Sequence, residues 1–183
     1  MATNSTIYKA EIHIADMDRQ YYQEHQFTIA KHPSETDERL MVRILAFALY
    51  ADASLEFGKG ISDDEEPALW VKDLVGNIEL WLEVGVPDER RIRKACGRAK
   101  QVVVLTYGRR NAAEMWWAQN KLELLKRDNL TVIHVVTEQT QALATLVART
   151  MQLSCTIEDG HIAMMSEAGT VALTPIFLQQ VSV

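Results

Sequence analysis

Between residues 78 and 149 the chain alternates between apolar strand patterns and amphipathic helix patterns, and this alternation limits the fold more than any other feature. Two nearly continuous apolar runs, QVVVLTY and LTVIHVV, are typical of central strands that are covered on both faces. Strands that alternate with helices usually lie parallel and are joined by right-handed crossovers. The pattern therefore predicts a parallel or mixed sheet, with strands at 78–84, 101–107 and 130–136 and helices at 87–100, 109–126 and 137–149.

Hairpin patterns stand at both ends of the chain. Residues 6–14 alternate between apolar and polar side chains, and residues 21–30 can pair back on them as a second strand. Near the C-terminus, Asp159 and Gly160 form a hairpin turn signal among short strand patterns. We therefore expect an α/β (mixed α+β) fold in one domain, 1–183: a mixed sheet flanked by helices, with antiparallel hairpins at both termini.

The helix starts can be read from capping residues. Ser34, with Asp37 three residues later, predicts the N-cap of a helix over about 35–51. Thr137 is expected to cap the last helix.

Several side chains are expected to lie in the core. Trp116, Leu122 and Leu125 are available for burial from the helix at 109–126. His134 stands inside an apolar strand, which favours a core histidine with its hydrogen bonds satisfied. Cys96 lies on an apolar helix face and is expected to be a buried free thiol.

Composition excludes some classes of function. The chain of 183 residues has a net charge of −6, so any nucleic-acid binding must use a local basic patch. No apolar run approaches the roughly 20 residues of a membrane helix, and the polar N-terminus is not a signal peptide. We expect a cytoplasmic protein that does not use a membrane. Neither a Gly-rich phosphate loop nor another organic-cofactor motif is present.

The strand at 78–84 offers two carboxylates. Strict alternation places Glu79 and Glu83 on one face, with Trp81 between them. Glu83 lies at the carboxyl end of the strand, where α/β sheets usually bind ligands. The alternative is a solvated outer face of an edge strand, and the pattern leaves both readings open.

The following helix is strongly basic. Arg91, Lys94 and Arg98 lie close together on a helical wheel, beside its apolar stripe. Their long stems can lie on protein while the charged groups reach a neighbouring site. For Arg90 and Arg93, plain solvation of a helix surface is the favoured interpretation.

Further acids could join Glu83. Glu38 aligns with the apolar face of its helix, although helix-dipole compensation is an alternative for first-turn acids. Residues 63–66 are four consecutive acids before Pro67, and such runs are usually solvated loops. Acids from a loop, a strand end and a helix are nevertheless the ligands that Mg²⁺ prefers, and a nearby lysine would stabilise a phosphorane.

Three blocks of the chain, HPSETDERLMVRILAFALYA, DDEEPALW and IELWLEVGVPDERRIRKACGRAKQVVVLTY, closely resemble the YaeQ family of small bacterial proteins. The resemblance covers essentially the whole chain. It implies a fold similar to the PD-(D/E)XK nuclease superfamily, with a metal-dependent phosphodiesterase pocket.

The resemblance also implies roles for individual residues. Glu83 matches the (D/E)XK acid, and Lys94 on the next helix would supply the lysine because Gly85 stands at its usual position. Since Ala68 follows Pro67, Asp64 or Glu66 would be the other metal ligand. The helix acid would be Glu38, and the phosphate-binding residues would be Arg91 and Arg98.

Two functions are therefore expected. One is an Mg²⁺- or Mn²⁺-dependent nuclease. The other is a nuclease-like fold without catalysis that binds nucleic acid or protein.

Overall fold

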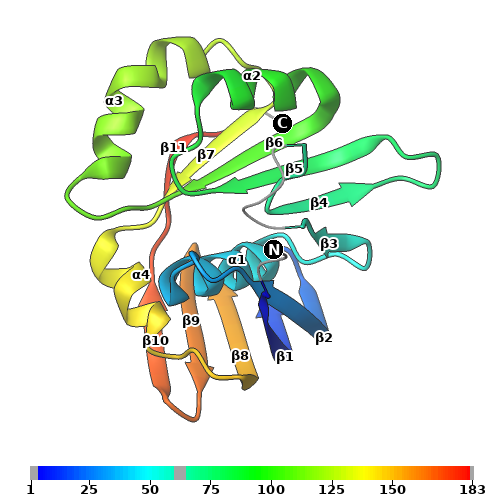
Figure 1. Ribbon diagram of the computed structural model, residues 1–183, viewed down its shortest axis with the longest axis vertical. Helices are drawn as coiled ribbons and strands as arrows, with labels where there is room; N and C mark the ends of the chain where they lie inside the picture. The colour runs from blue at the N-terminus through cyan, green and yellow to red at the C-terminus, as the bar shows by residue number, and fades with distance from the viewer. Residues whose placement is uncertain (1–3, 60–64, 182–183) are drawn as a thin grey trace.

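The computed structural model of the chain describes residues 4–59 and 65–181. They form two β-sheets and four helices (Figure 1). The elements in chain order are β1 (Thr6–Asp16), β2 (Tyr21–Lys31), α1 (Asp37–Leu49), β3 (Leu55–Phe57), β4 (Leu69–Lys72), β5 (Ile78–Val84), α2 (Glu89–Arg98), β6 (Ala99–Thr106), α3 (Ala112–Leu124), β7 (Leu130–His134), α4 (Thr137–Ala144), β8 (Thr150–Glu158), β9 (His161–Ser166), β10 (Gly169–Leu173) and β11 (Ile176–Gln179).

One sheet, which we call the central sheet, has the order β11-β7-β6-β5-β4-β3. Its strands β5, β6 and β7 run parallel, whereas β3, β4 and β11 pair antiparallel. The predicted strand–helix alternation with parallel pairing is therefore confirmed. The short edge strands β3 and β11 were not predicted from the sequence.

The second sheet, which we call the terminal sheet, has the order β10-β9-β8-β1-β2. Both predicted terminal hairpins are confirmed, but the expectation of a single mixed sheet was wrong. The two hairpins join because β1 and β8 pair in parallel, with Ile12 opposite Leu153. Both strands bury alternate side chains, so joining them extends one apolar face across five strands.

Helix α1 lies between the two sheets (Figure 1). Every side chain from Leu40 to Ala48 is buried, as expected for a helix that is covered on all sides. Helices α2 and α3 cover the other face of the central sheet, where Ile92 and Trp116 pack against Val102 and Val104. The arrangement leaves the outer face of the terminal sheet uncovered by helices (Figure 1).

Two predicted helix starts were wrong. The N-cap of α1 is Thr36, whose hydroxyl accepts a hydrogen bond from the Arg39 amide, while the Ser34 hydroxyl contacts the His32 ring. The N-cap of α4 is Val136, because the Thr137 hydroxyl donates to the Gly108 carbonyl instead.

Two further expectations were wrong, one about the burial of leucines and one about the hydrogen bonds of His134. Leu122 and Leu125 are 73% and 56% exposed, because α3 contacts the sheet only through a narrow stripe that includes Trp116. His134 is buried and its Nε2 lies 3.2 Å from Glu114, yet within the described residues its Nδ1 has no partner. Within those same residues, no helix is long and apolar enough to cross a membrane.

Candidate functional site

Glu83 lies at the carboxyl end of β5, next to Val104 of the parallel strand β6. Its side chain is almost completely buried, which excludes the alternative of a solvated outer face. One carboxylate oxygen, Oε1, accepts hydrogen bonds from Trp81 Nε1 at 2.8 Å and from Arg91 Nε at 2.7 Å. Burial raises the pKa of Glu83, and the charge and hydrogen bond of Arg91 and the indole N–H oppose that shift.

Local structure explains how Arg91 reaches Glu83. Asp88 caps α2 through a hydrogen bond from the Arg90 amide, so the helix begins a few residues after β5 ends. The first turn then returns Arg91 to the strand that it follows. On the same face the Arg98 guanidinium lies over the Trp81 ring, 5.2 Å from its centroid. Arg91 and Arg98 therefore both lie at the face that carries Glu83.

Glu79 does not belong to this site, contrary to the simple alternation. It forms an ion pair of 2.6 Å with Lys100. At this end of β5 the pairing with β4 shifts register, and Ile78 packs in the same cluster as Trp81. A register irregularity changes which face successive side chains occupy, so alternation across it cannot be extrapolated.

The described part of the acidic segment, Glu65 and Glu66, contacts α2. Arg91 Nη2 donates to the Glu66 carbonyl at 2.8 Å. Lys94 Nζ lies 2.7 Å from Glu65 Oε1, and Arg98 Nη1 lies 3.6 Å from Glu65 Oε2. Lys94, expected to serve Glu83, is thus paired with a loop acid that the sequence did not single out.

Of the two metal ligands expected in the acidic segment, Asp64 and Glu66, the structure describes only Glu66. The Glu66 carboxylate accepts a hydrogen bond from the Lys59 amide at 2.9 Å, while its own main chain faces Arg91. Asp64 lies outside the described residues. In the part of the chain that the structure describes, Glu66, Glu83 and Glu38 each contact different partners and do not form one set of metal ligands.

Glu38 is buried on α1 but faces α4. Its Oε1 accepts a hydrogen bond of 2.8 Å from the Thr140 hydroxyl, and Oε2 lies 3.8 Å from Arg109 Nε. Burial raises the pKa of Tyr107, which directly follows β6, to about 12, and the negative charge of Glu38 adds to this shift. Glu38 therefore lies at the carboxyl end of the central sheet, like Glu83, but without a contact to it.

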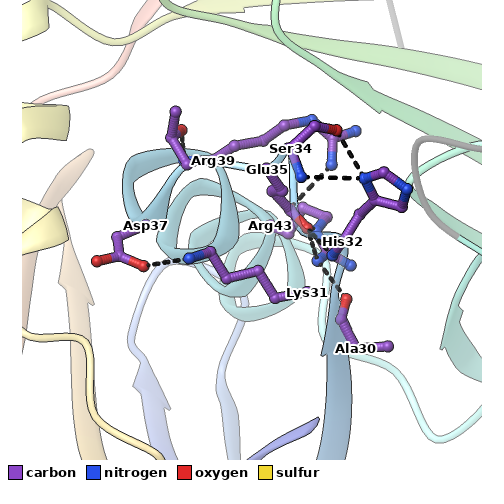
Figure 2. A network of polar contacts seen from close by, with 9 residues as sticks. Ala30, Lys31, His32, Ser34, Glu35, Asp37, Arg39 and Arg43 are labelled. Carbon is purple, nitrogen blue, oxygen red and sulfur yellow. Dashed lines mark hydrogen bonds and ion pairs between the residues drawn. The ribbon is translucent and has the colours of Figure 1, made fainter. Parts of the chain in front are cut away.

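A buried ionic network that sequence reasoning missed stands at the start of α1 (Figure 2). Glu35 accepts from Arg43 Nε and Nη2, both at 2.8 Å, and from Arg39 Nη1 at 3.0 Å. Arg43 also donates to the Ala30 carbonyl and is only 1% exposed. These three residues stand four positions apart in the sequence, and that spacing was a signal that could have revealed the network.

The network also acts on the candidate site through its charge. Burial raises the pKa of Glu83, and the positive charge of Arg39, like that of Arg91, opposes this shift. Arg43 itself is desolvated, which lowers the pKa of its guanidinium, and the Glu35 charge opposes this. The site therefore combines buried carboxylates, each held by at least one arginine or hydroxyl group.

The comparisons agree with one another. The sequence model of the family described as YaeQ protein matches residues 1–175. The chain is 42% identical, over 182 residues and the full length of both proteins, to the uncharacterized protein YaeQ of Escherichia coli (strain K12). The crystal structure of YaeQ from Xanthomonas axonopodis pv. citri is similar, with a TM-score of 0.94 and 48% identity over 96% of this chain and 99% of that one. The structure of YaeQ from Pseudomonas syringae has a TM-score of 0.91 and 33% identity, over 96% and 97% of the two chains. The chain therefore belongs to the YaeQ protein family.

Proposed function

We propose that the protein is a nuclease-like, PD-(D/E)XK-type fold that binds the phosphate backbone of nucleic acid through α2 and does not hydrolyse it. The observation that carries this proposal is the pairing of Arg91 with Glu83. A metal ion at Glu83 would have to displace a guanidinium from a buried carboxylate. Such a charge-assisted hydrogen bond is among the strongest that proteins form.

The exposed side of α2 supports the binding role. Arg90, Arg93, Lys94 and Arg98 are all exposed, and within the described residues Arg90 and Arg93 make no ion pair. Lysine and arginine side chains gain affinity for nucleic acid by releasing the counterions of the phosphates. Because the whole chain carries a charge of −6, binding through this local patch is expected to be weak and strongly dependent on salt.

The test is fluorescence anisotropy with labelled single- and double-stranded oligonucleotides over a range of salt concentrations. The variant Arg93→Ala/Arg98→Ala removes two charges from α2, and Lys121→Ala/Lys126→Ala removes two from the region of α3 as the matched control. We expect the α2 variant to bind at least tenfold more weakly and to lose about 0.9 from the salt slope per phosphate contact removed. Equal binding by both variants would contradict the role of α2, and binding of a protein partner at α2 would then have to be sought.

A second candidate is a Mg²⁺- or Mn²⁺-dependent nuclease, in which Glu83, Asp64 or Glu66 would hold the metal. The observation that favours it is that Arg91 bridges the Glu83 carboxylate and the Glu66 carbonyl, which brings the main chain of Glu66 close to Glu83. In this case Lys94 would leave Glu65 to stabilise the transition state, with Glu38 assisting.

The two candidates separate in a cleavage assay with Mg²⁺ or Mn²⁺ on DNA and RNA substrates. If the wild type cleaves and Glu83→Gln does not, the nuclease is established and the non-catalytic proposal fails. If neither protein cleaves while both bind, the binding proposal stands. The Glu83→Gln variant keeps the shape of the side chain, so circular dichroism can verify that it is folded.

A further inference from the structure

The outer face of the terminal sheet carries a cluster of potential metal ligands, far in sequence from the candidate site. His13 on β1 lies directly opposite Glu24 on β2 in the antiparallel register. Glu11 stands two residues before His13 and therefore projects from the same face of β1. We propose that Glu11, His13 and Glu24 form a binding site for a divalent transition-metal ion of the Zn²⁺ class.

The three side chains lie close enough to share one ion, which would bind a single nitrogen of the His13 ring. His13 Nε2 lies 3.2 Å from Glu11 Oε1, and His13 Nδ1 lies 3.6 Å from Glu24 Oε2. The ligand atoms of the three residues all lie within 4.8 Å of one another. Cross-strand neighbours in a sheet are held at a fixed separation by the ladder, so the backbone already places the three side chains for binding.

Electrostatics supplies a second argument for a cation at this place. A neutral imidazole has one N–H group, and its other nitrogen is an acceptor. Both ring nitrogens of His13 face carboxylate oxygens. In the neutral ring, the nitrogen without a proton would therefore face an oxygen that is also an acceptor, unless a further proton or a metal ion lies between the two atoms. In the described part of the chain, neither Glu11 nor Glu24 is paired with a lysine or arginine.

The donor set indicates the class of metal. One imidazole nitrogen and two carboxylate oxygens suit Zn²⁺ and its transition-metal neighbours, whereas Mg²⁺ and Ca²⁺ prefer oxygen ligands alone. His13 and Glu24 are exposed, so water completes the coordination sphere and the ion exchanges with solvent. Ser154 of β8 stands beside His13 in the parallel register and offers a further oxygen.

The experiment is titration of tag-free, full-length protein with ZnCl₂ by isothermal calorimetry, together with NMR of the histidine ring resonances. Excess Mg²⁺ is present throughout, so that sites made of oxygen ligands alone do not contribute. The variants are His13→Ala and Glu24→Gln, and the control is His161→Ala, which removes another exposed histidine of the same sheet.

We expect the wild type and His161→Ala to bind one Zn²⁺ at this site, with selective shifts of the His13 ring. His13→Ala and Glu24→Gln should each bind at least about tenfold more weakly, since even the loss of an outer-shell partner costs that much. The proposal is overturned if all four proteins give the same isotherm. It is equally overturned if the His13 ring responds to pH but not to Zn²⁺, because the cluster then takes only a proton.

Discussion

Removing the buried charge of Glu35 tests how the start of α1 is held. Glu35→Gln leaves the Arg43 guanidinium, with 1% of its surface exposed, without a counter-charge. Loss of one partner from a buried ion pair costs about 3–5 kcal/mol of the free energy of unfolding. Because domains are stable by only about 5–15 kcal/mol, the variant should unfold at a much lower urea concentration.

The double variant Glu35→Gln/Arg43→Met separates the charge from the packing. It removes both buried charges and keeps an apolar side chain beside Phe57, so we expect it to recover at least about half of the lost stability. Urea unfolding is followed by tryptophan fluorescence and circular dichroism. Glu123→Gln, at an exposed pair with Lys126, is the control and should unfold like the wild type. The single variant Arg43→Met completes the set: if its loss of stability and that of Glu35→Gln simply add in the double variant, the pair is not coupled and the reasoning fails.

Three further predictions concern polar and charged side chains. Thr106→Val should raise the free energy of unfolding by about 1 kcal/mol, measured by urea unfolding, since the buried Thr106 hydroxyl has no partner among the described residues. Arg19→Ala should lower the free energy of unfolding by about 1–2 kcal/mol, because Arg19 donates to the Ala48 and Ala51 carbonyls at the end of α1. An unchanged free energy of unfolding would mean that water replaces these hydrogen bonds without cost. For Glu83 the pKa is raised above its ordinary 4.5, so the folded state takes up the proton first as the pH falls. Relative to Glu83→Gln, the wild type should gain stability as the pH falls through the raised pKa of Glu83, with no further gain below about 4.5; a loss over this range would show that the Arg91 pairing outweighs burial.

Much of the architecture follows from local patterns. The apolar runs at β6 and β7, the alternation at β1 and the turn at Asp159 and Gly160 each depend on neighbours in the chain. Asp159 and Gly160 both have positive φ, 50° and 75°, as the hairpin signal requires. The covered face that carries Glu83 was also within reach, because Trp81 stands two residues before it on the same strand.

The partner of Lys94 was not within reach of the sequence. Lys94 could serve any acid near α2, and only the tertiary structure gives it Glu65. Glu35 was expected in the first turn of α1, where compensation of the helix dipole accounts for an acid; the structure places it before the N-cap Thr36 and pairs it with the buried Arg43.

The sequence alone therefore determined where the longer strands and helices form, since their apolar side chains repeat with the period of each element. Only the tertiary structure decided that β1 pairs with β8, more than a hundred residues away, and so formed a second sheet over α1. An edge strand presents the same unpaired N–H and C=O groups to any partner, so the choice between partners is made by the packing of the whole chain.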